Sequence, residues 1–300
     1  MAIKNFAELI AKVQTTQDRK RMAVVAADDE HTLEAVIQAR RNAIAEPLLI
    51  GNPDRIREVL KGLQEDAGAF QVIEALDNEG AAYKGVELIH QGQADIIMKG
   101  KLQTGELLRA VVDKEKGLRA GKIVSHIAFK EIPNYHKLVV MTDGGMATYP
   151  DLEQKRHILE NAVHILHVLG YAKPKAAVLA AVETLNPKMP ETVDAAELKA
   201  LNLSGELMDC IVEGPISYDL AMSKEAARLK GYQSPVAGDA DILLMPNITA
   251  GNILGKCLLC SAQAKMAGFI VGARVPVVVT SRGSTAEEKY LSIVLAAAVA

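Results

Sequence analysis

The chain contains 300 residues, of which 49% are hydrophobic, and it carries a formal net charge of −3. This length suggests two domains or one large one, with enough apolar residues for sizeable cores. The small net charge excludes a general attraction to nucleic acid or membranes, and the lack of Trp argues against a base-stacking platform.

Cysteine usage and the first residues predict a soluble protein of a reducing, cytoplasmic compartment. Three cysteines give no disulfide framework. Cys257 and Cys260 form a C-x-x-C inside the apolar run 253–267 without a second pair, so we expect two buried helix thiols. Residues 1–6 lack the apolar core of a signal peptide, and no run approaches the ~18 apolar residues of a membrane span.

Strand-like and helix-like segments alternate through the first part of the chain. Residues 22–27 form an apolar strand, and Asp28 and Asp29 can cap a helix that begins near His31. Further strands are predicted at 48–50, 72–73 and 94–98, and helices at 54–64, 86–91 and 105–112.

The second part of the chain continues this alternation. Strands are predicted at 138–141, 176–181, 242–245 and 275–280, and helices at 152–169, 195–201, 223–230, 252–267 and from Thr285 onward. Ser223 is a suitable cap for its helix. Continuous apolar strands between helices predict an α/β protein with mainly parallel sheets flanked by helices on both faces.

Ligands of such folds bind beyond the carboxyl ends of the strands. This rule selects five loops that are rich in polar and small residues, at 28–29, 99–101, 142–145, 246–252 and 281–284. Their small residues allow the backbone to approach a ligand closely.

The loop after the strand at 94–98 resembles a nucleotide-binding loop only in part. Gly100 and Gly105 have the glycine spacing of a P-loop, but Glu106 stands where a P-loop has lysine. No G-x-G-x-x-G follows a strand, so a dinucleotide site is also disfavoured. An acyl or phosphate-bearing ligand would be held here by Lys99, Lys101, Thr104 and Arg109. Solvated lysines at a helix entry explain the loop equally well.

The loop 246–252 combines polar side chains with a helix start. Asn247, Thr249 and Asn252 surround a glycine after Pro246. Capping explains one of these side chains but not readily both amides, so we slightly favour a binding role.

Ser281, Arg282 and Gly283 place a hydroxyl, a guanidinium and a flexible residue between a strand and a helix. A helix N-terminus favours an anion, and the planar guanidinium fits phosphate or carboxylate. The segment therefore predicts a phosphate or acyl-phosphate site. Glu287 and Glu288 in the following turn either complement the helix dipole or supply a general base.

Three histidines lie on one face of the helix predicted at 152–169. His157, His164 and His167 have no further ligands or carboxylate shell nearby in the sequence. We interpret them as surface or interface residues and predict no metal site.

Six short segments follow one another along nearly the whole chain. They are AADDEHTLEA (26–35), MKGKLQT (98–104), TDGGM (142–146), EGPISYD (213–219), PNITAGN (246–252) and SRG (281–283). In order and spacing they resemble the phosphate acetyl/butyryltransferase family and, within it, the butyryltransferases.

This resemblance implies the two-domain fold of the isocitrate and isopropylmalate dehydrogenases. One domain would comprise residues 1–122 and 270–300, and the other residues 123–269, with a cleft between them. It also implies a homodimer, or a higher homo-oligomer, built largely on the middle domain. The implied partners are acyl-CoA or CoA and phosphate or acyl phosphate, without a permanent cofactor or metal.

The implied reaction is reversible transfer of a short-chain acyl group, butyryl or branched, between CoA and phosphate. By resemblance to the acetyl enzymes, Ser281 and Arg282 form the catalytic pair. The catalytic carboxylate seven residues beyond the serine falls on Glu288, where the acetyl enzymes have Asp. Asn247, in place of the Asp common in the acetyl enzymes, favours the larger acyl groups.

Three alternatives stay open at this point. The nearest is a phosphate acetyltransferase. A metal- and NAD-dependent hydroxyacid dehydrogenase of the same fold would need converging carboxylates, for which Asp239 and Asp241 are the close pair. A CoA-binding protein without catalytic activity would not need both Ser281 and Arg282.

Overall fold

The computed structural model describes residues 3–16, 18–281 and 283–300. Two compact units make up this part of the chain. The terminal unit consists of Phe6–Gly121 and Ala267–Ala300, and the middle unit of residues 3–5 and Lys122–Met266.

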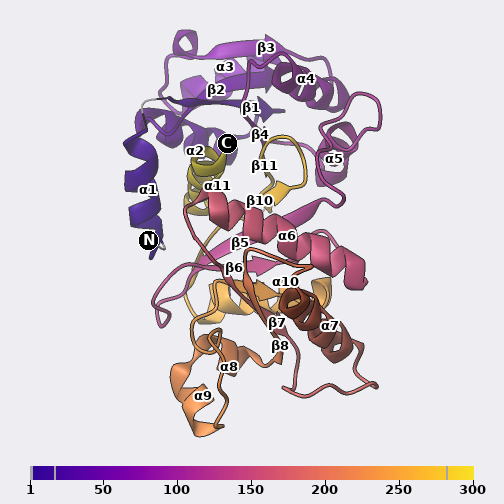
Figure 1. The fold of residues 1–300 in the computed structure, drawn as a ribbon. Helices are drawn as coiled ribbons and strands as arrows, with labels where there is room; N and C mark the ends of the chain where they lie inside the picture. The colour runs from indigo at the N-terminus through magenta and orange to yellow at the C-terminus, as the bar shows by residue number, and fades with distance from the viewer. Residues whose placement is uncertain (1–2, 17, 282) are drawn as a thin grey trace. The chain divides into compact units, whose positions relative to one another are not determined.

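The terminal unit is an α/β structure with helices on both sides of its sheet (Figure 1). Its elements are α1 (Phe6–Gln14), β1 (Lys20–Val25), α2 (Glu30–Arg41), β2 (Ala45–Gly51), α3 (Pro53–Gly62), the 3-10 helix η1 (Ala67–Ala69), β3 (Gln71–Glu74), α4 (Asn78–His90), β4 (Ile96–Lys99), α5 (Thr104–Val111), most of β10 (Lys265–Val271), β11 (Val277–Val278) and α11 (Ala286–Val299). Helix α11 packs against α1 and α2, and α4 packs against α5.

The strands of the terminal unit are ordered β3-β2-β1-β4-β11-β10. All neighbours from β3 to β11 run parallel, and β10 is antiparallel to β11. Strand β4 is buried at every position, as expected of a central parallel strand between helix layers. The short strand predicted at 72–73 is β3, which stands first in this order.

The middle unit has strand order β5-β6-β9-β7-β8. Its elements are β5 (Ser125–Glu131), β6 (Val139–Thr142), α6 (Leu152–Val168), β7 (Lys175–Leu179), α7 (Pro190–Ser204), β8 (Ile211–Ile216), α8 (Tyr218–Met222), α9 (Lys224–Leu229), β9 (Ile242–Leu244) and α10 (Ile248–Ser261). Strands β6, β9, β7 and β8 are parallel, and β5 is antiparallel to β6. The predicted mainly parallel α/β class is therefore confirmed.

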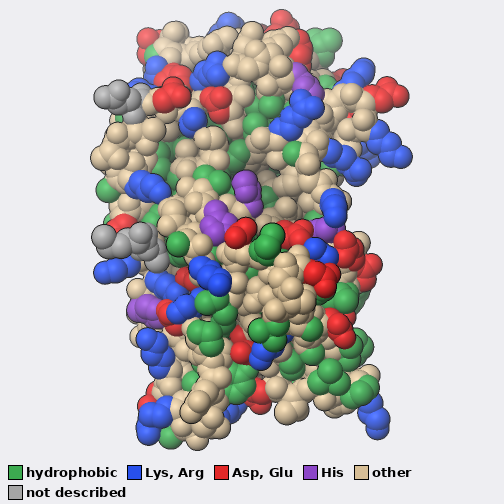
Figure 2. Space-filling model, viewed as in Figure 1, with side chains coloured by type: hydrophobic (Ala, Val, Ile, Leu, Met, Phe, Trp, Pro, Cys, Tyr) green, Lys and Arg blue, Asp and Glu red, His purple; other side chains and the backbone are tan. Residues whose placement is uncertain are grey.

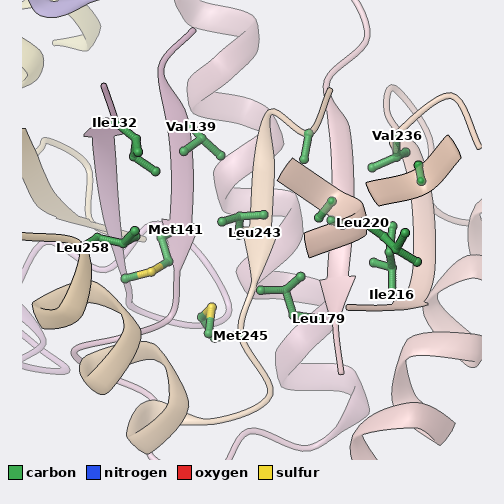
Figure 3. Close-up of a cluster of buried hydrophobic side chains, with 14 of the residues drawn as sticks. Ile132, Val139, Met141, Leu179, Ile216, Leu220, Val236, Leu243, Met245 and Leu258 are labelled. Carbon is green, nitrogen blue, oxygen red and sulfur yellow. The ribbon is translucent and has the colours of Figure 1, made fainter. Parts of the chain in front are cut away.

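A cluster of buried apolar side chains forms part of the middle unit's core. Figure 3 shows Val139, Met141, Leu243 and Leu179, from strands β6, β9 and β7, together with Leu220 from α8. Burial of these large apolar side chains is the main favourable contribution to folding of such a unit.

One predicted boundary in the middle unit is wrong. The helix expected at 252–267 is α10, which begins at Ile248 because the Asn247 side chain caps it, and which ends at Ser261. Gln263 has a positive φ of 52°, which breaks the helix, and Lys265 begins strand β10. The apolar run 253–267 therefore contains the end of a helix and the start of a strand, which periodicity alone does not separate.

The two thiols of that run are exposed and not buried as predicted. Helix α10 buries Gly251, Gly255 and Leu258, which recur at helical spacing. Cys257 and Cys260 fall outside this stripe and reach the surface.

Residues 3–5 belong to the middle unit although the next residues begin the terminal unit. The carbonyl of Ile3 accepts hydrogen bonds from the Leu138 N–H at 3.4 Å and the Tyr171 hydroxyl at 3.2 Å.

Figure 2 shows Lys and Arg side chains interspersed with Asp and Glu over the visible face of each unit. On that face, neither unit therefore has a continuous surface region of a single charge.

Candidate functional site

A cavity of about 580 Å³ opens at the carboxyl ends of three neighbouring parallel strands of the terminal unit, β1, β4 and β11. Its lining residues are Asp29, His31, Thr32, Asn78, Lys99, Gly100, Lys101, Leu102, Gln103, Glu106, Thr280, Ser281 and Lys289. The strand-end rule selected three of the loops that supply these residues, at 28–29, 99–101 and 281–284.

The loop after β4 lies directly against the end of β1. The Gly100 N–H donates to the Val25 carbonyl and the Lys101 N–H to the Ala26 carbonyl, both at 2.8 Å. A Cβ on Gly100 would lie 2.7 Å from the Val25 oxygen and closer still to that of Ala26. Glycine is required here by close backbone approach, and the approach fixes the wall of the cavity.

Lys99 shapes this loop from within. Its side chain is buried, and its Nζ donates to the carbonyl oxygens of Gly100 at 3.0 Å and Leu102 at 3.1 Å. The sequence predicted Lys99 as a ligand-binding residue. The lysine lines the cavity, but these bonds also give it a structural role in holding the loop.

Of the other residues predicted in this loop, only one lines the cavity. Lys101 is exposed and lines the cavity. Thr104, the first residue of α5, and Arg109, in its last turn, are not among the lining residues. Gln103 and Glu106, which were not predicted, line the cavity instead and form a reciprocal capping box at the start of α5.

Asp29 connects the start of α2 to the cavity. As predicted, it is the N-cap of α2, and it accepts a hydrogen bond from the Thr32 N–H at 2.9 Å and another from the Thr32 hydroxyl. Partial burial opposes ionisation of Asp29, but the bonds from Thr32 and the Lys289 ammonium hold the pKa of the carboxyl below its ordinary value. Asp29 is thus an ionised group on the cavity wall.

The segment between β11 and α11 supplies Thr280 and Ser281 to the cavity. The Ser281 carbonyl accepts from the Ser284 N–H at 3.1 Å, and its Oγ from the Gly283 N–H at 3.4 Å, so the segment turns back on itself. Gly283 is exposed and does not line the cavity. Arg282, the predicted partner of Ser281, lies outside the described residues.

The first turn of α11 contains three charged residues, of which only Lys289 lines the cavity. The helix is capped by Thr285, whose hydroxyl accepts from the Glu288 N–H at 3.1 Å. Glu287 is exposed and Glu288 half-buried, and neither is a lining residue. Lys289, which the sequence did not single out, is buried on the cavity wall. The available signal was a lysine that precedes the long, mainly apolar remainder of the helix.

The amides predicted as ligands belong to the middle unit. Asn247 accepts from the Ala250 N–H at 3.0 Å as the N-cap of α10, and the Asn252 amide is 3.5 Å from the Gly144 carbonyl. Asn247 and Thr249 line a second cavity of about 600 Å³, which Asn252 does not. Its other lining residues are Tyr149, Ala250, Ile253, Leu254 and Cys257.

Asp143 organises the T-D-G-G-M segment of the middle unit. Its carboxylate accepts from the N–H groups of Gly145 and Met146, both at 2.7 Å, and of Ala147 and His126, at 3.2 and 3.0 Å. Four backbone donors occupy this side chain, so its evident role is to fix the loop.

A metal site would need several ligating side chains close together. No group of three or more His, Cys, Asp or Glu side chains suited to a metal ion occurs in residues 3–16, 18–281 and 283–300. The interpretation of His157 as a surface or interface residue is wrong, because it is buried between Glu153 at 3.0 Å and Glu160 at 2.7 Å. Within the same described ranges, no helix has the length and apolar character to cross a membrane.

The carboxylates considered for a dehydrogenase are already paired with lysines. Lys137 Nζ lies 2.6 Å from Asp241 and 2.9 Å from Asp239, and Lys175 forms a second ion pair with Asp239. These contacts neutralise the two carboxylates that a divalent ion would need.

These features together describe an α/β protein with cationic and hydroxyl groups around a cavity at the ends of parallel strands. The chain belongs to the phosphate acetyl/butaryl transferase family, whose model matches residues 78–297. The resemblance seen in the motifs is therefore confirmed.

Relatives of both acyl types are similar to almost the whole chain. The phosphate butyryltransferase of Clostridium acetobutylicum is 44% identical over 298 residues, covering 99% of each chain. The phosphate acetyltransferase of Thermotoga maritima is 43% identical over 281 residues, covering 94% of this chain and 95% of that one.

Solved structures agree with this assignment. A branched-chain phosphotransacylase from Enterococcus faecalis V583 superposes with a TM-score of 0.84 at 34% identity, covering 93% of this chain and 99% of that one. A 4-hydroxythreonine-4-phosphate dehydrogenase from Burkholderia phymatum gives a TM-score of 0.57 at 14% identity, covering 93% and 99%. This second likeness concerns the fold alone, and it agrees with the predicted dehydrogenase-like architecture.

Proposed function

We propose that this protein is a phosphate acyltransferase that catalyses the reversible reaction of acyl-CoA with phosphate to give acyl phosphate and CoA. The proposal is carried by one observation, the cavity in which Lys101, Lys289, Thr280 and Ser281 meet at the ends of parallel strands in a member of this family. Ammonium and hydroxyl groups are suitable partners for phosphate oxygens.

The reaction passes through a tetrahedral intermediate. A phosphate oxygen attacks the thioester carbonyl, the carbon–oxygen bond forms, the carbon–sulfur bond breaks, and the proton of the attacking phosphate ends on the CoA thiol. The carbonyl oxygen gains negative charge in the intermediate and needs fixed donors. We assign this stabilisation to Ser281 and Arg282, and the proton transfer to Glu288 or Glu287.

The proposed function also assigns the contacts to the substrates. We assign phosphate and CoA binding to Lys99, Lys101, Thr104 and Arg109 with Gly283, and acyl-CoA contacts to Asn247, Thr249 and Asn252. The cavity lining supports Lys99 and Lys101 most directly.

The acyl group is proposed to be butyryl or a branched short chain, with acetyl as the alternative. The names of the relatives do not decide this, because butyryl and acetyl enzymes are almost equally similar to the chain. Asn247 is the residue that favours the larger groups. One methylene in an apolar pocket is worth only ~1–3 kcal/mol, so the preference is one of rate rather than an absolute choice.

The remaining properties are proposed with the function. CoA acts as a substrate, and we expect no permanently bound cofactor or metal. We also propose a homodimer, or a larger homo-oligomer, formed largely by the middle unit, and a cytoplasmic location without nucleic-acid or membrane partners.

A thiol-release assay tests the function. Acetyl-, butyryl- and isobutyryl-CoA are each supplied with and without phosphate, and the appearance of free thiol is followed. We expect release that requires phosphate and is fastest with butyryl- or isobutyryl-CoA. Release without phosphate would indicate a thioesterase, and CoA binding without release would indicate a binding protein. Magnesium-dependent reduction of NAD with a hydroxyacid would instead establish the dehydrogenase alternative.

A further inference from the structure

Lys289 occupies a position that is costly for a lysine. It lies in the first turn of α11, where the helix dipole disfavours a cation, and its side chain is only 7% exposed. A buried ammonium costs free energy unless it is paired and hydrogen-bonded. Its surroundings should therefore supply compensating contacts.

The compensation within the protein is incomplete. The nearest carboxylate oxygen, Asp29 Oδ2, is 3.6 Å from Lys289 Nζ, which is an ion pair but beyond hydrogen-bond distance. That oxygen already accepts two bonds from Thr32. Across the described part of the chain, no residue accepts a hydrogen bond from Nζ.

The ammonium nevertheless is not sealed inside the protein. Among the described residues, every buried side-chain nitrogen or oxygen atom has a hydrogen-bond partner. Since Nζ of Lys289 has none, it must be accessible, and the residue lines the cavity. Lys99 differs, because its Nζ donates to two loop carbonyls. Lys289 thus presents a cation with unused donors to the cavity from the first turn of α11.

We propose that Lys289 binds an anionic oxygen of phosphate, and of the phosphoryl group of acyl phosphate, while Asp29 is a positioning residue that holds the ammonium when no anion is bound. This inference rests on the proposed function and adds a residue to it. The ammonium can donate a charge-assisted hydrogen bond to a phosphate oxygen. Because the aliphatic part of the Lys289 side chain is already packed, binding the anion costs no further side-chain entropy. The Asp29 carboxylate repels the same anion and moderates its affinity.

The two residues should therefore have opposite effects on phosphate. Lys289→Met removes the charge and keeps the apolar stem, and we expect the KM for phosphate to rise about 10- to 100-fold, as for loss of one charged hydrogen bond. The KM for acyl-CoA should change less than about twofold, and Lys289→Arg should retain part of the affinity. Asp29→Asn keeps a capping side chain, and the KM for phosphate should stay equal or fall.

Steady-state thiol release at varied phosphate and acyl-CoA gives these constants, and Lys84→Met serves as the control. Lys84 belongs to the same unit, pairs with Glu87 at 2.9 Å on α4 and lies outside the cavity. Protection of the protein against thermal unfolding by inorganic phosphate, without CoA, gives a second measure of affinity. Lys289→Met should lose this protection, and Lys84→Met should keep it.

An unchanged phosphate KM in folded Lys289→Met, or an equal rise in both KM values, would overturn the inference. If Lys289→Met does not fold, Asp29→Asn combined with Lys289→Met removes both charges and provides the same readout. Wild-type protein that releases no thiol would refute the proposed function, and loss of phosphate protection in Lys289→Met would still report on Lys289. Equal protection of wild type and variant would refute the inference in that case too.

Discussion

Glu287 and Glu288 differ in environment although they are neighbours in the first turn of α11. Glu288 donates its N–H to the Thr285 hydroxyl and accepts from the Ser292 hydroxyl at its carbonyl, which leaves its half-buried carboxylate outside the helix hydrogen bonds. Glu287 is exposed. The choice of general base is therefore a choice between two neighbouring carboxylates that differ in their exposure to solvent.

We expect Glu288→Gln to lower kcat by about 10²–10⁴-fold, the usual contribution of a positioned general base. Glu287→Gln should retain nearly the full rate. The measurement is kcat against pH for both variants. A general base must be deprotonated, so Glu288→Gln should also flatten the acid limb of the profile. Full rates for both variants at every pH would show that neither carboxylate acts as the base.

At the scale of elements, the connection from β4 to α5 determines one wall of the cavity. Its path depends on the absence of a side chain at Gly100, where the backbone crosses the end of β1. Gly105, five residues later and inside α5, has no heavy atom within 4 Å of the point that a Cβ would occupy. The two glycines therefore have different reasons to be present.

Gly100→Ala should destabilise the protein by about 1–3 kcal/mol, because the added methyl meets backbone oxygens that cannot move aside cheaply. It should also weaken phosphate binding, since Lys99 and Lys101 flank the displaced residue. Gly105→Ala should be neutral or stabilising by up to about 1 kcal/mol, because alanine favours the helix. Urea unfolding of both variants tests this. Equal stability of the two would mean that the loop relaxes around the methyl group.

A second element-scale feature is the charge cluster where β6, β7 and β9 begin. Asp239 accepts from Lys137 and from His136, both at 2.9 Å, and from Lys175. Burial opposes its ionisation, but these donors hold the pKa of Asp239 well below its ordinary value of 3.8. A lowered pKa in the folded state means that the ionised carboxylate stabilises the fold above pH 3.8 and loses this contribution as the pH falls further.

Asp239→Asn should therefore cost about 1–3 kcal/mol near pH 7, where an ionised acceptor is replaced by a neutral one. The difference from wild type should shrink as the pH is lowered below 4. Urea unfolding at both pH values measures it. Asp18→Asn is the control, because the side chain of Asp18 is 90% exposed and such pairs contribute little. If the loss in free energy of unfolding is the same at both pH values, the negative charge of Asp239 does not contribute to stability.

At the scale of the whole molecule, the chain leaves one compact unit and returns to it. The units change over between residues 121 and 122 and between 266 and 267, while the domain boundaries were predicted near residues 122 and 269. The middle unit has its own sheet and its own apolar core. A domain with these properties can fold alone.

We expect a fragment of residues 122–266 to fold and to form a dimer, because the proposed oligomer contact lies largely on the middle unit. It should be less stable than the full chain, since the Ile3 carbonyl no longer accepts from Leu138 and Tyr171. Circular dichroism and light scattering coupled to size exclusion measure both properties. A folded monomeric fragment beside a dimeric full chain would place the dimer contact elsewhere.

The sequence by itself determined features that depend on neighbouring residues. The caps at Asp29 and Ser223 are where they were predicted, because a short polar side chain before a helix bonds the N–H groups of the next turn. The α/β class and the family follow from alternating segments and motif order. Strands β5, β8 and β10 were not predicted, and the run 253–267 was assigned to one helix, because short apolar segments carry no unambiguous period.

Only the tertiary structure decided which side chains meet at the cavity. Pairing of β4 with both β1 and β11 brings Asp29, Lys99 and Ser281 to one sheet edge, although long stretches of chain separate them. Burial of α11 turned Lys289 from an unremarked helix residue into a cation with unused donors. Such properties arise from long-range packing, whereas capping and periodicity are local and can be read directly from the chain.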